Sequence, residues 1–144
     1  MIDLKFFHFG DWRYADGRLQ LPAKLSVAQE TGIAAWLYVF KLPDRVLYVG
    51  ETEQQLRVRL ELYRSGHTGT TNVHKRELLT EATLAGWRIR IEASPAPEDT
   101  NLRRDLEREM VERFDPPWNY RAGLPGRIKG YGPSLVAPSA VQRR

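Results

Sequence analysis

The sequence predicts an α+β domain built on a small, mostly antiparallel three-stranded sheet flanked by helices. Two observations predict the sheet: a pair of apolar segments separated by a Pro-Asp turn at residues 33–49, and a segment of alternating polarity at residues 87–92. A third observation predicts the helices, because leucines and alanines recur at helical spacing in the intervening and following segments. At 144 residues, the chain is long enough to bury the core of one compact domain.

Each expected strand has its own signal. Residues 33–40 are dense in β-branched and aromatic side chains, which is typical of a buried strand. Pro43-Asp44 then turns the chain into residues 46–49, and so short a link predicts an antiparallel pair. Residues 87–92 alternate apolar and polar side chains, which indicates a half-buried strand.

Three longer helices are expected, each with a stop signal. Leu56, Leu60 and Tyr63 share one face of the first, over residues 54–63, and Ser65-Gly66 ends it. The second begins near Thr71 or Asn72 and stops at Gly86, and the third is capped by Asp99 or Thr100 and runs to about Phe114, before Pro116-Pro117.

The chain divides into three parts. Residues 1–32 form an N-terminal extension packed on the core, with a short apolar strand at 4–9 and turn signals at Gly10-Asp11 and Asp16-Gly17. Residues 33–121 form the main domain. Residues 122–144 form a basic tail rich in Gly and Pro that shows no periodicity.

The net charge of +4 lies on that tail. Residues 122–144 hold four basic residues and no acid, so the first 121 residues carry 22 − 4 = 18 basic side chains against 18 acidic ones. A basic tail beside a neutral body suits a polyanionic partner, because each phosphate contact releases counterions. A solvated tail that keeps the protein soluble is the alternative interpretation.

Composition excludes several classes of site. The chain has no cysteine, which excludes disulfides, cysteine-based zinc sites and a thiol nucleophile, and fits a cytoplasmic protein. No apolar run approaches the roughly 20 residues that span a bilayer, so no membrane partner is expected. The first residues lack the features of a secretory signal.

Arg59 and Tyr63 are the first candidates for chemistry. Their spacing of four places both on one face of a helix. An arginine offers a planar fork of donors that matches phosphate oxygens. A tyrosine, with a pKa of about 10, is a poor base unless a neighbouring cation lowers that pKa. Alone, the pair is equally typical of an amphipathic helix with one solvated and one packed side chain.

Glu107 is the second candidate. Met110, Val111 and Phe114 share its helix face, so its carboxylate lies at the edge of the core or within it. A buried charge needs a partner. Mg²⁺ is a natural one, because it takes oxygen ligands and often only one or two carboxylates. An ordinary ion pair on a charge-rich helix surface is the alternative.

The joint order of these residues resembles the GIY-YIG nuclease family. That family carries two short tyrosine motifs on adjacent antiparallel strands, then a helical Arg, a His or Tyr one turn later, a Glu on a later helix and an Asn about twelve residues beyond. The matching residues here are Tyr38, Tyr48-Val49-Gly50, Arg59, Tyr63, Glu107 and Asn119. The resemblance covers residues 33–121, with one departure: Trp36 stands where the first motif has glycine.

The resemblance implies a metal-dependent endonuclease that hydrolyses phosphodiester bonds in DNA with one Mg²⁺ or Mn²⁺ ion. It implies that Glu107 holds the metal, that Arg59 stabilises charge in the transition state, and that Tyr38 or Tyr63 takes the proton of the attacking water. Tyr48 would orient water or phosphate, and Asn119 would brace the site. A catalytically inactive nucleic-acid-binding module of the same fold is the alternative, favoured by Trp36 and the basic tail. A structural domain without a nucleic-acid role is a weaker third reading.

Specificity is not readable from these residues. Nucleic-acid contacts are expected from His74, Lys75 and Arg76 and from Arg127 and Lys129 of the tail. DNA is the expected partner, and RNA stays open. Targeting would come from the tail, from residues 67–76, from a homodimer or from a separate targeting partner, and restriction, repair and mobile-element roles all fit.

Overall fold

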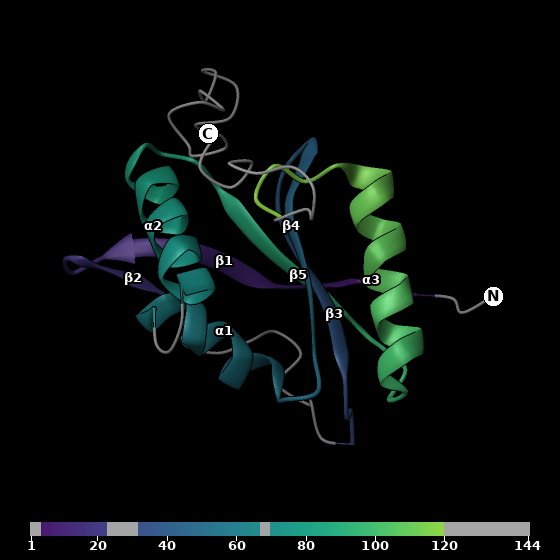
Figure 1. Ribbon diagram of the computed structural model, residues 1–144. Helices are drawn as coiled ribbons and strands as arrows, with labels where there is room; N and C mark the ends of the chain where they lie inside the picture. The colour runs from purple at the N-terminus through teal and green to yellow at the C-terminus, as the bar shows by residue number, and fades with distance from the viewer. Residues whose placement is uncertain (1–3, 23–31, 67–69, 120–144) are drawn as a thin grey trace.

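The computed structural model describes residues 4–22, 32–66 and 70–119. Within these ranges, five strands form one antiparallel sheet in the order β2-β1-β5-β3-β4, accompanied by three helices (Figure 1). The strands are β1 (Phe7–Ala15), β2 (Arg18–Gln20), β3 (Trp36–Leu42), β4 (Arg45–Thr52) and β5 (Ile89–Pro95). The helices are α1 (Leu56–Ser65), α2 (Thr70–Leu84) and α3 (Thr100–Phe114).

The predicted α+β class is confirmed, and the predicted three strands are corrected to five. Strands β3, β4 and β5 are the three expected ones. The N-terminal part supplies two more, because β1 pairs with β5 through partners such as Trp12 and Ile89. The strand expected at residues 4–9 overlaps only the first part of β1, and β2 was not predicted. The local pattern did not show that β1 pairs with β5 and so belongs to the same sheet.

The two N-terminal turn signals have different outcomes. Asp16-Gly17 forms the β1–β2 turn, with φ angles of 54° and 77°. Gly10-Asp11 lies inside β1, where the pairing with β5 shifts register between His8 and Gly10. Gly10 has a φ of 141°, and an added Cβ would lie 2.3 Å from the Pro22 side chain. A bulge therefore replaces the expected turn, and the glycine permits it.

The helices lie on both faces of the sheet. Helices α1 and α2 pack together over one face, and α3 lies on the other side, against the edge strand β4 (Figure 1). The side chain of Asp99 caps α3 by accepting a hydrogen bond from the Leu102 amide at 2.8 Å. Helix α3 ends at Asp115, in the left-handed region, immediately before Pro116-Pro117. The edge strand β4 therefore lies against α3, which carries Glu107, and contacts α1 through Tyr48 and Tyr63.

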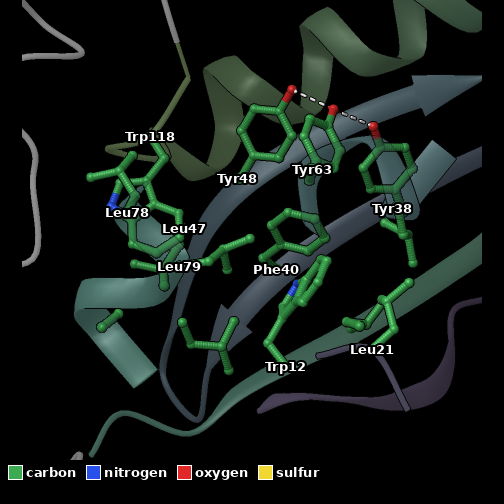
Figure 2. Packing of buried hydrophobic residues seen from close by; sticks show 14 of the residues in the cluster. Trp12, Leu21, Tyr38, Phe40, Leu47, Tyr48, Tyr63, Leu78, Leu79 and Trp118 are labelled. Atoms are coloured by element: carbon green, nitrogen blue, oxygen red, sulfur yellow. Dashed lines mark hydrogen bonds between the residues drawn. The ribbon is translucent and has the colours of Figure 1, made fainter. Parts of the chain in front are cut away.

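Aromatic side chains dominate the core beneath α1 and α2. Phe40 is fully buried, with its ring centroid 5.4 Å from Trp12 and 5.8 Å from Tyr63, both edge to face (Figure 2). Burial of each such side chain stabilises the fold by about 1.5–3 kcal/mol. The rings of Tyr38, Tyr48 and Tyr63 belong to this cluster, so the core fixes their positions.

Trp36 is a core residue. Its side chain is 1% exposed, and its ring packs edge to face on Phe9 of β1 at 5.4 Å. Tryptophan at the glycine position of the motif therefore fills the contact between β3 and the N-terminal strand. The departure from the family pattern has a packing explanation.

No helix among residues 4–22, 32–66 and 70–119 is long and apolar enough to cross a membrane. The proposed tail, residues 122–144, lies outside the described residues.

Candidate active site

Three tyrosine hydroxyls form a hydrogen-bonded row at the border of the aromatic core. The Tyr63 hydroxyl lies 2.6 Å from that of Tyr38 and 3.1 Å from that of Tyr48. Figure 2 shows the three oxygens in line, with the rings below them in the core. Strands β3 and β4 and helix α1 each supply one member. The structure thus brings together three residues that lie up to 25 positions apart in the chain.

The hairpin register and one glycine make room for this row. Tyr38 pairs with Gly50, and Phe40 pairs with Tyr48, across β3 and β4. A Cβ at Gly50 would lie 2.4 Å from the Tyr38 hydroxyl oxygen. Any larger residue would displace that hydroxyl, so the Tyr-Val-Gly motif has a steric reason for its glycine.

Arg59 binds two of the three phenols. Its Nη2 donates to the Tyr63 oxygen at 2.9 Å, and its Nε donates to the Tyr38 oxygen at 3.3 Å. The guanidinium carbon also lies 4.8 Å from the centroid of the Tyr63 ring. Among the described residues, no carboxylate forms an ion pair with Arg59. This half-buried cation is therefore solvated by neutral phenols.

Burial and mutual proximity keep two of these phenols protonated in the free protein. Desolvation raises the pKa of Tyr38 well above 10, and the neighbouring Tyr63 and Tyr48 raise it further. Desolvation also raises the pKa of Tyr48 well above 10, again reinforced by Tyr63. Arg59 lowers both values by less than burial raises them. For Tyr38, the expected effect of a neighbouring cation is thus outweighed by burial.

Glu107 of α3 faces the same site. Its carboxyl is half-buried, and its pKa is raised to about 7, first by desolvation and next by the charge of Glu51. The charges of three arginines partly offset this increase by lowering the pKa: Arg104, Arg59 and Arg103. The Glu107 carboxylate also contributes to the raised pKa of Tyr48, so it lies within electrostatic range of the phenol row. The sequence-based expectation of a carboxylate at the edge of the core fits this placement.

A second arginine near the site is absent from the sequence-based prediction. Arg103 is 1% exposed and binds Glu51 and, at 2.7 Å, Glu53. It also donates to the carbonyls of Pro97 and Glu98 at 3.0 and 3.1 Å. The signal for its burial was its position four residues before Glu107 on the same helix face.

Asn119 binds the free edge of β4. Its Oδ1 accepts from the Val49 amide, and its Nδ2 donates to the Val49 carbonyl, both at 2.9 Å. The Trp118 amide donates to the Leu47 carbonyl at 2.9 Å, so the two consecutive residues extend along the strand. The amide side chain therefore fixes β4 between Tyr48 and Gly50, two residues of the phenol region.

One carboxylate is the candidate metal ligand. Among the described residues, no three acidic or histidine side chains gather into a metal-binding group. Glu51 is engaged by Arg103, which leaves Glu107 as the desolvated carboxylate without an ion pair in the described part of the chain. A hard divalent cation that takes one carboxylate and completes its shell with phosphate and water fits this donor set.

The basic triplet in α2 divides among three environments. Arg76 is exposed, donates to the Ser65 carbonyl at 3.2 Å, and lines a groove with Arg18 and Arg64. His74 is partly buried. Lys75 is 1% exposed, with its Nζ 4.7 Å from the centroid of the Tyr48 ring. Because Lys75 is buried, it does not lie on the surface where nucleic-acid contacts were expected. Arg127 and Lys129 lie outside the described residues.

Structural comparison relates the fold to a known phage enzyme. A glutamate-to-alanine mutant of bacteriophage T4 EndoII superposes with a TM-score of 0.55 over 80% of this chain and 92% of that one, at 21% identity. The two chains share a fold. A second structure, the restriction endonuclease HPY188I in complex with product DNA, matches with a TM-score of 0.47 at 10% identity, over 83% of this chain and 80% of that one.

Sequence comparisons add no relative. No protein-family model matches the chain, and no curated protein matches it significantly. What is shared with the phage endonuclease is therefore the fold.

Proposed function

We propose that the protein is a DNA endonuclease of the GIY-YIG type, which hydrolyses phosphodiester bonds with a single Mg²⁺ or Mn²⁺ ion. One observation carries the proposal: Arg59, three phenols and the Glu107 carboxylate converge at one edge of the sheet, and among the described residues the guanidinium forms no ion pair. The fold shared with T4 EndoII supports it.

Arg59 suits the charge that develops during phosphodiester hydrolysis. As water attacks phosphorus, negative charge grows on the non-bridging oxygens. A positive fork already held in place by Tyr38 and Tyr63 stabilises that charge without reorganising at the moment of reaction. A carboxylate partner would weaken this effect, so the absence of an ion pair in the described residues favours a phosphate-binding role.

Glu107 would hold the cation. A bound Mg²⁺ would supply a counter-charge for the phosphate and leaving oxygens. The raised pKa of about 7 shows that the ionised carboxylate is poorly stabilised by the protein alone, which is the condition under which a cation contributes most. The carboxyl must lose its proton on binding, so metal affinity should increase with pH.

The phenol row would handle the proton of the attacking water. To accept it, Tyr38 or Tyr63 must first ionise, and Arg59 contacts both oxygens and stabilises either phenolate. Tyr48 donates or accepts at the other end of the row and would orient water or phosphate. Asn119 would brace the strand that carries Tyr48.

DNA would also contact basic surface outside the site. Arg18, Arg64 and Arg76 line one groove between the β1–β2 hairpin and helices α1 and α2. We propose phosphate contacts there and from Arg127 and Lys129 of the tail. Trp36 no longer favours the alternative of an inactive binding module, because its packing on Phe9 explains why tryptophan stands at this position.

Cleavage of supercoiled plasmid DNA in Mg²⁺ tests the proposal. Glu107→Gln should lower the rate by about 100-fold or more, as expected for a group that acts in the transition state. EDTA should abolish cleavage by the wild-type protein. Glu109→Gln is the matched control, because it removes an exposed carboxylate from the same helix and should cut at the wild-type rate.

Two results would contradict parts of the proposal. A Glu107→Gln protein that cuts within a few-fold of the wild-type rate would refute the metal-binding role. Intact plasmid together with salt-sensitive binding would favour the inactive module instead.

A further inference from the structure

Lys75 is buried, and its charge does not stabilise the fold at this position. It lies on α2, with 1% of its surface exposed. Burial lowers the pKa of its ammonium to about 8. A methionine of similar shape would fill the same space without that desolvation cost. The lysine therefore destabilises its surroundings relative to an apolar residue, and a role outside folding would explain its presence.

In the described part of the chain, the contact of this ammonium is with the Tyr48 ring. The Nζ atom lies 4.7 Å from the ring centroid, which is within cation–π range. The hydroxyl of the same ring lies 3.1 Å from that of Tyr63, the central member of the row. A positive charge over a phenol ring draws electron density from its oxygen and makes its O–H a stronger donor.

We propose that Lys75 is a positioning residue for the nuclease reaction, and that it acts through Tyr48. Its ammonium holds the Tyr48 ring and, when the Tyr48 hydroxyl is the donor, strengthens its hydrogen bond to Tyr63. When Tyr63 carries negative charge, that donor and Arg59 stabilise it from two sides. The inference rests on the proposed endonuclease activity and assigns Lys75 to the active site instead of the DNA-binding surface.

Burial separates this role from a phosphate contact. A lysine that bound DNA directly would release a counterion, and its loss would reduce the salt dependence of binding. A lysine beneath Tyr48 cannot reach a phosphate while that ring stays in place. Its loss should therefore change the rate of the chemical step and leave binding unaltered.

Lys75→Met is the test, with cleavage, DNA binding and unfolding measured on the same preparation. We expect kcat to fall about tenfold, the size of one desolvated cation–π contact. KM and the salt slope of DNA binding should stay unchanged, and the unfolding midpoint should rise. The exposed Glu77→Gln on the same helix is the matched control and should alter none of these. Arg76→Gln, an exposed cation in the proposed groove, should reduce the salt slope by about 1.

The stabilisation by Lys75→Met has a defined pH dependence. The ammonium pKa is about 8 in the fold and 10.5 as the ordinary value, so folding disfavours the charged form. The cost is fully present below pH 8 and fades as the pH rises toward 10.5. The titratable group placed toward the ammonium is Tyr48, whose own pKa burial raises well above 10, so its hydroxyl stays protonated while the ammonium titrates near pH 8.

A double-mutant cycle with Tyr48→Phe keeps the test decisive even if a single variant is less stable. Because Lys75 acts through the Tyr48 hydroxyl, Lys75→Met should have no further effect on kcat in the Tyr48→Phe background. Wild-type kcat in Lys75→Met would overturn the inference, as would additive losses in the cycle or a loss confined to KM with a shallower salt slope. A wild-type protein that fails to cut plasmid would refute the proposed function itself, before Lys75 is tested.

Discussion

Two arginines near the edge strand β4 occupy opposite electrostatic environments. Arg103 is buried, and its donors meet two carboxylates and two backbone carbonyls. Arg59 is half-buried, and its donors meet the neutral phenols of Tyr38 and Tyr63. The charge of Arg103 is neutralised within the protein, whereas the charge of Arg59 is left available for an anion.

A structural arginine and a functional one differ in whether the protein neutralises the charge of the guanidinium. A buried arginine whose donors are satisfied by carboxylates and backbone carbonyls contributes to folding, and removing it leaves those acceptors without their partner. An arginine held in a fixed geometry by neutral groups contributes little to folding and attracts phosphate. Charge neutralisation, and not burial, separates the two.

Replacement of Arg103 should give the largest effect on stability. Arg103→Met leaves Glu51 without its main partner and two carbonyls without donors, so we expect a loss of about 3–5 kcal/mol. Urea denaturation measures it. Arg104→Met is the control, because Arg104 is 63% exposed and its loss should stay within about 0.5 kcal/mol. If Arg103→Met lowered the free energy of unfolding only marginally, Arg103 would not have the structural role assigned to it.

A smaller effect should follow from Glu107, which lies within electrostatic range of both arginines. Its pKa is about 7 in the fold against an ordinary 4.5, so ionisation in the folded state costs stability as the pH rises from 4.5 to 7. Glu107→Gln should remove that cost. In EDTA, its advantage should be absent near pH 4 and reach about 1–2 kcal/mol by pH 8, discounted for partial exposure. An advantage independent of pH would show that Glu107 is not desolvated.

The main domain was largely predictable because its signals are local. Helical periodicity, the Pro43-Asp44 turn and the alternation at residues 87–92 predicted the hairpin, the third strand and the helices. The contribution of the N-terminal strands to the sheet was underestimated, because β1 pairs with β5, which lies some eighty residues later in the chain. The turn predicted at Gly10-Asp11 was wrong for a related reason. A Gly-Asp dipeptide occurs both in turns and in bulges, and the long-range register of β1 on β5 determines which of the two forms.

The sequence predicted those parts of the candidate site in which the residues lie on one helix or one hairpin. Arg59 and Tyr63 share a helix face, and the hairpin register places Tyr38 near Tyr48. Lys75 and Arg76 look alike in sequence, but consecutive helical residues point about 100° apart, so one is buried and the other exposed. Arg103 is one of several arginines on a charged helix, and its carboxylate partners come from β4 and the residue that follows it.

The cleavage rate of Arg59→Gln, per folded molecule, distinguishes a functional role of Arg59 from a structural one. Arg59 should be dispensable for folding and essential for the reaction. We predict a rate at least about 100-fold below that of the wild type under saturating Mg²⁺ and plasmid, with the free energy of unfolding changed by no more than about 1 kcal/mol. A variant that unfolds readily, or one that cuts at nearly the wild-type rate, would contradict the account.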